Sequence, residues 1–123
     1  MTGAKLGRVA ADERGVRRKR WLGLFGGEFD LPWEAITAWA TGADVIQSHE
    51  HPNGLAVSWV IEIDHARGTE VVRWGRGASP FDAFVAVVAV RLPGRRRPGR
   101  VAQRYDARLP EPLARIAGLH RDP

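Results

Sequence analysis

The sequence predicts a mainly β chain with one C-terminal helix, an α+β class, and three observations support this prediction. Residues 28–31 and 55–64 alternate polar and apolar side chains with the period of two that is typical of half-buried strands. Glycine turns such as Gly26-Gly27 separate these segments. Over residues 79–92 the apolar spacing changes to the i, i+3, i+4 repeat of an amphipathic helix.

The expected strands follow one another along the first two thirds of the chain. The alternation and the turn residues place six of them at residues 5–11, 16–25, 28–31, 36–40, 55–64 and 69–74. The segment 36–40 has an optional continuation through Val45-Ile46. A seventh strand is expected to be short and to lie within residues 37–55. Residues 33–36 should form a tight corner that turns Trp33 and Ile36 inward.

The helix prediction rests on a start signal and an apolar stripe. Ser79 suits the N-cap, Pro80 suits the first helical position, and Asp82 can complete a capping box. The stripe that should face the core consists of Phe81, Phe84, Val85, Val88 and Leu92. Pro93-Gly94 should end the helix. A strand over residues 84–90 is the competing interpretation, because its valines lower helix propensity.

The opposite face of this helix is also apolar, although a surface helix normally shows water a polar face. Its members are Ala83, Ala86, Val87 and Val90. Either another chain or the C-terminal residues 112–120, as a short helix, should cover this face. We favour association with another chain, because the linker of residues 94–100 is rich in Pro, Gly and Arg and would hold the tail loosely.

Charge is distributed unevenly along the chain. The net charge is +5, yet residues 21–90 contain nine carboxylates and three arginines, so both ends are basic and the middle is acidic. The absence of cysteine excludes disulfides, thiol catalysis and thiolate metal sites. The longest apolar run, residues 83–90, is far shorter than the roughly 20 residues that cross a bilayer. We therefore expect a cytoplasmic protein, with peripheral attachment to the inner membrane as an option.

The densest basic cluster lies on the first predicted hairpin and comprises Arg14, Arg17, Arg18, Lys19 and Arg20. It could attract an anionic lipid surface. The plainer interpretation is a solvated edge strand whose charges prevent edge-to-edge pairing. Consecutive charges on a strand also point to alternate faces, so only some of them could share one ligand.

A second basic group follows the helix and comprises Arg95, Arg96, Arg97 and Arg100. Its Pro and Gly neighbours indicate a mobile, solvated linker. Contact with nucleic acid through counterion release is the functional alternative.

Metal binding and catalysis find little support in the sequence. The residue types of His49-Glu50-His51, with His65 as a third ligand, suit a metal site, but they lack the ligand spacing of known metal motifs. Asp64-His65 lies in a tight turn with no nucleophile pattern beside it. We therefore expect no enzyme, no metal, no cofactor and no small-molecule substrate.

The order of elements, with Gly15-Val16 before a strand and Leu31-Pro32-Trp33-Glu34-Ala35-Ile36 at a corner, resembles bacterial pleckstrin-homology-like (PH-like) domains. The resemblance covers roughly residues 5–92. It implies a small barrel of two nearly orthogonal antiparallel sheets, with six to seven strands, capped by helix 79–92. Residues 1–92 would form this domain, and residues 93–123 a basic extension containing the candidate helix 112–120.

What the resemblance implies for function is a non-catalytic binding module. Protein–protein interaction or self-association is the expected role, with an unknown protein or a second copy of the chain as the partner. The first alternative is peripheral binding of anionic lipid head groups through the basic hairpin. The second alternative is weak nucleic-acid contact through the arginine-rich tail. A shared fold does not by itself assign a ligand.

Overall fold

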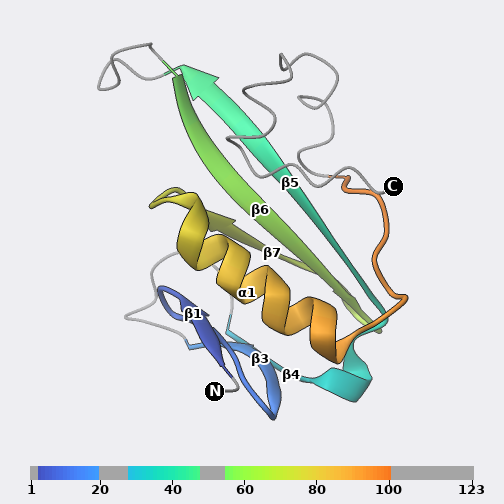
Figure 1. Ribbon diagram of the computed structural model, residues 1–123. Coiled ribbons are helices and arrows are strands. Elements are labelled where there is room, and N and C mark those ends of the chain that lie inside the picture. The colour runs from blue at the N-terminus through green and yellow to red at the C-terminus, as the bar shows by residue number, and fades with distance from the viewer. Residues whose placement is uncertain (1–2, 20–27, 48–54, 101–123) are drawn as a thin grey trace.

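Two antiparallel sheets and one helix make up the computed structural model, which describes residues 3–19, 28–47 and 55–100. The first sheet has the order β1-β2-β3-β4 and the second the order β5-β6-β7. The strands are β1 (Ala4–Leu6), β2 (Val9–Ala11), β3 (Gly15–Arg18), β4 (Phe29–Pro32), β5 (Ala38–Gln47), β6 (Leu55–His65) and β7 (Gly68–Trp74). The helix α1 (Ala78–Arg91) follows them, so the predicted mainly β class with one C-terminal helix is confirmed (Figure 1).

The sheets do not close into the expected barrel. Within the described residues, β4 pairs only with β3 and β7 pairs only with β6, so the two end strands leave an opening between the sheets. The expected location of the seventh strand is also wrong. The segment 5–11 is not one strand, because it folds back at Gly7 into the hairpin β1–β2. Residues 38–47 form the single strand β5.

The first sheet has one buried and one solvent-facing side. Its register aligns Lys5, Ala10, Arg17 and Asp30 across the four strands. The neighbouring row of Leu6, Val9, Arg18 and Phe29 lies on the other side, where all but Arg18 are buried. The polar–apolar alternation of these short strands therefore separates a basic outer face from an apolar inner face.

The corner after β4 confirms the predicted inward side chains. It is a short 3₁₀ helix, η1 (Trp33–Ala35), in which Trp33 is buried, and Ile36 follows it with no exposed area. The indole Nε1 of Trp33 donates a hydrogen bond of 2.8 Å to the backbone carbonyl of Asp12. Gly15 is packed so closely against Leu31 that a Cβ atom there would collide with the Leu31 carbonyl oxygen. These contacts join the β2–β3 hairpin to the corner.

The second sheet is buried on both sides of its central strand. Trp59, Ile61 and Ile63 on one face belong to the main core. The other face presents Val60, which is fully buried, and Glu62, which is only 1% exposed. A single solvent-facing side, which the alternation alone predicts, therefore does not describe β6.

The helix begins at Ala78, two residues before the predicted first helical position at Pro80, and without the expected cap. Gly77, with φ of +105°, occupies the N-cap position and no side chain caps the helix. A φ in this range favours glycine, and Trp74 Nε1 donates a 3.0 Å hydrogen bond to the Gly77 carbonyl. Ser79 lies inside the first turn, so its assignment as the N-cap is wrong. The strand alternative for residues 84–90 is also wrong.

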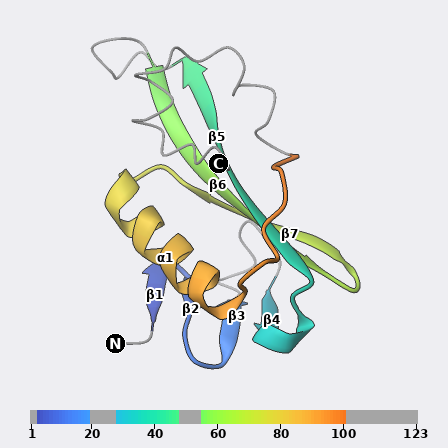
Figure 2. The same ribbon diagram turned by 45° about the vertical axis from the view of Figure 1, so that its right-hand side comes forward.

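The apolar stripe of α1 faces the core, as the sequence predicts, and it lies between the two sheets. Phe81, Phe84 and Val88 have no exposed area, and Leu92 after the helix is buried as well. Figures 1 and 2 show the helix crossing the inner side of the first sheet beside β6, and the β5–β6 hairpin extends past the helix start. One helix therefore contributes to both halves of the core.

We expect Phe84→Ala to lower the free energy of unfolding by about 3–5 kcal/mol, because a fully buried phenylalanine leaves a cavity when truncated. Chemical denaturation followed by tryptophan fluorescence measures the change. Ala89→Gly at an exposed position of the same helix is the control, with an expected loss near 1 kcal/mol from helix propensity alone. A Phe84→Ala loss as small as the control's would contradict the core assignment.

Candidate functional site

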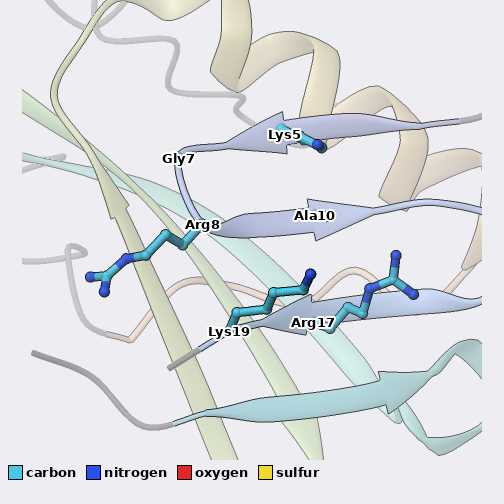
Figure 3. A pocket seen from close by; sticks show the side chains of 6 residues that line it. All are labelled: Lys5, Gly7, Arg8, Ala10, Arg17 and Lys19. Atoms are coloured by element: carbon cyan, nitrogen blue, oxygen red, sulfur yellow. The ribbon is translucent and has the colours of Figure 1, made fainter. Parts of the chain in front are cut away.

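The basic outer face of the first sheet is the site that the predicted cluster builds. Lys5 on β1, Ala10 on β2 and Arg17 on β3 are register partners, so their side chains form one row. Together with Arg8 in the β1–β2 turn and Lys19 after β3, they line a shallow hollow of about 200 Å³ (Figure 3). The small Ala10 side chain leaves room between the cations above the sheet. This arrangement of four basic side chains could hold an anionic group.

Only some of these cations are neutralised by carboxylates. Arg17 forms an ion pair with Asp12 at 2.6 Å. The backbone N–H of Arg14 also donates to the Asp12 carboxylate, at 2.9 Å. This hydrogen bond, followed by the charge of Arg17, lowers the pKa of Asp12 below its ordinary value. Within the described residues, neither Lys5 nor Lys19 has a carboxylate partner.

The structure divides the predicted cluster instead of bringing it together. Arg18 lies on the inner side of the sheet, where its guanidinium stacks 5.0 Å from the Phe29 ring centroid. Its Nη1 also donates to the Val71 carbonyl at 3.4 Å, so Arg18 connects the two sheets. Arg14 lies in an exposed turn, and Arg20 is outside the described residues. Lys5 and Arg8, which the sequence analysis did not include, take the places beside Arg17 and Lys19.

The predicted interaction face of α1 is largely exposed. Ala83, Ala86 and Val90 are open to solvent, and Val90 is 79% exposed. Val87 differs from them, because it is half-buried and packs against the core. The proposed cover by residues 112–120 lies outside the described part of the chain.

The arginines after α1 form ordered contacts, so their description as a solvated linker is wrong. Backbone hydrogen bonds join Arg95 and Arg97 to Trp39, which makes a parallel bridge at the edge of β5. Arg96 stacks 5.1 Å from the Trp39 ring and donates to Thr41 Oγ1 at 2.7 Å. Residues 95–100, which we call the C-terminal strap, thus continue the fold beyond the expected boundary at residue 92.

Arg97 is the centre of this strap. Its guanidinium binds Asp64 through Nε at 2.6 Å and Glu62 through Nη2 at 3.0 Å. The backbone N–H of Arg100 donates to the second oxygen of Glu62 at 2.9 Å. The buried Glu62 carboxylate is thereby paired on both oxygens, which is what a buried charge requires.

The pKa shifts of Asp64 and Arg97 agree with this geometry. The hydrogen bonds from Arg97 lower the pKa of Asp64 from 3.8 to about 2. Asp64, followed by Glu62, raises the pKa of Arg97. This network is not predictable from local sequence patterns, because Glu62 and Arg97 lie 35 positions apart. The one available signal is an acidic residue between Ile61 and Ile63 in the most apolar strand.

The candidate metal and catalytic residues do not assemble in the described part of the chain. His49, Glu50 and His51 are outside it. His65 pairs with Glu70 at 2.8 Å, whereas Asp64 binds Thr69 and Arg97. Across residues 3–19, 28–47 and 55–100, no group of three histidine or acidic side chains is arranged to hold a metal.

Comparison of the chain with known proteins identifies no relative. No protein-family model matches the chain, and no match is found among curated proteins or among solved structures. In the described ranges, no helix has the length and apolar character needed to span a membrane. Any functional assignment therefore rests on the site residues themselves.

We expect Arg97→Ala to lower the free energy of unfolding by about 3–5 kcal/mol, because the variant leaves the Glu62 carboxylate buried without its cation. Arg91→Ala, which removes an exposed arginine from α1, should change stability by less than about 0.5 kcal/mol. Equilibrium denaturation of both variants measures the difference. Equal stabilities would mean that the strap does not stabilise the fold.

Proposed function

We propose that the protein is a non-catalytic binding module that self-associates through the exposed face of α1. The observation that carries this proposal is the 79% exposure of Val90, on a helix face shared with Ala83 and Ala86. Burial of such a face is favourable, and its small side chains allow two helices to approach closely. None of these three residues carries a charge, so two identical faces do not repel one another. A second copy of the chain is therefore the partner that fits this surface.

The PH-like assignment belongs to the same proposal. A four-stranded sheet, a three-stranded sheet and a final helix follow one another in the order that the resemblance implies. The opening between β4 and β7 is the departure from a closed PH-like barrel. A scaffold of this type supports binding without chemistry.

We expect Val90→Glu to make the protein monomeric, because the carboxylate would have to be buried against an identical carboxylate. Static light scattering across a concentration series measures the mass. Ala66→Glu, which places the same charge in the exposed β6–β7 turn, is the matched control and should leave the mass unchanged. A wild-type protein that remains a monomer at every concentration would refute self-association.

Binding to anionic lipid head groups is the second candidate function, and the hollow of Figure 3 favours it. Lys5 and Lys19 project from the solvent-facing side and have no carboxylate partner in the described chain. Arg14 and Arg18, in contrast, are not among the residues that line the hollow, and Arg20 lies outside the described residues. The residues expected to bind the lipid head group are therefore Lys5, Arg8, Arg17 and Lys19, in place of the full predicted cluster.

We expect the double variant Lys5→Ala/Lys19→Ala to lose roughly 2 kcal/mol of binding to vesicles with anionic lipid, at about 1 kcal/mol for each basic group near the surface. Cosedimentation at low and high salt measures this loss. Arg76→Ala/Arg91→Ala removes the same charge from exposed positions elsewhere and should retain most of the binding. Equal losses in the two double variants would exclude the hollow as the lipid site.

A further inference from the structure

The opening between the two sheets forms a groove along the free edge of β4. The groove encloses about 780 Å³ and is bounded by β4, the η1 corner and the β6–β7 turn. In the described structure, neither β4 nor β7 has a strand on its outer side. Unpaired strand edges are templates for an additional strand, so the groove combines space with backbone groups that can bind an extended chain.

The side chains of the groove specify the charge of such a chain. Phe29, Leu31 and Ala35 supply apolar surface. Around them lie four carboxylates, Glu28, Asp30, Glu34 and Glu70. Arg67 is the one arginine or lysine among the lining residues, and His65 is already paired with Glu70.

This charge pattern distinguishes between possible occupants. Two copies of the same edge would bring like carboxylates together, so the edge disfavours pairing with itself. A cationic strand would instead gain from every carboxylate that it meets, and alternate apolar side chains could face the apolar lining. The carboxylates thus disfavour pairing of the open β4 edge with a second copy of itself, and they favour a cationic partner strand.

We propose that the groove between β4 and β7 binds an extended, lysine- or arginine-rich segment of another protein as an added strand. The segment pairs with the free backbone edge of β4. Its basic side chains meet the carboxylates of Asp30 and Glu34, and its apolar side chains contact Phe29 and Leu31. This site is separate from the exposed face of α1, so the proposal does not depend on self-association.

The test is fluorescence anisotropy of the full-length protein with a labelled peptide of alternating lysine and valine. Wild-type protein should bind the peptide at low salt and more weakly as salt increases, and a peptide with glutamate in place of lysine should not bind. The variant Asp30→Lys/Glu34→Lys should weaken binding about tenfold or more, since two attractive pairs become repulsive. Both positions are exposed, so the variant should fold, and circular dichroism checks this.

Two controls decide between this site and a general effect of charge. Glu13→Lys/Asp82→Lys changes the net charge equally at exposed positions outside the groove and should alter binding less than about twofold. A peptide methylated on alternate backbone nitrogens keeps its charge but cannot pair as a strand, so it should bind much more weakly. Absence of wild-type binding, equal weakening in both double variants, or equal binding of the methylated peptide would each overturn the proposal.

Discussion

The burial of one face of α1 between the two sheets is the constraint on which the rest of the structure depends. Within the described residues, each sheet turns an apolar side toward α1. Phe81, Phe84 and Val88 of the helix fill the space between these sides and have no exposed area. Because the helix uses one stripe for this purpose, its other side must face outward. The exposed Ala83, Ala86 and Val90 are therefore a consequence of how the core is filled.

A second, polar constraint fixes the other side of the β5–β6 pair. Glu62 is buried in the most apolar strand, and it can keep its charge there because Arg97 and the backbone of Arg100 reach it. Removing one partner of a buried pair of this kind is costly, because the other charge is then left uncompensated. The strap is thus held by Glu62 and Asp64 together with the backbone of Trp39.

Local patterns in the sequence predicted the elements well where short-range physics decides them. The alternation in residues 28–31 and 55–64, the inward Trp33 and Ile36, and the buried stripe of α1 all follow from spacing along the chain. The start of α1 was misplaced because Gly77, with its positive φ, replaces a side-chain cap. The hairpin at Gly7 was missed because each of its strands has three residues, too few to show a period.

The candidate site was harder to predict because it depends on pairing across strands. A run of basic residues looks continuous in sequence, but the pleat sends Arg17 and Arg18 to opposite sides of β3. Lys5 comes beside Arg17 only through the register of β1 with β2 and of β2 with β3. The groove between β4 and β7 is likewise a property of sheets that stay open. No local spacing could reveal either arrangement.

The packing of α1 against β1 also bears on how quickly the protein can reach its native state. These elements lie at opposite ends of the described chain, yet they are in extensive contact. Bringing them together requires closure of a loop that contains both sheets, and its entropic cost is met before the helix gains its core contacts. Domains dominated by such distant pairings fold in milliseconds to seconds, whereas locally connected helical bundles fold in microseconds to milliseconds. During synthesis the first hairpin must therefore wait for the helix, with Leu6 and Val9 uncovered until α1 arrives.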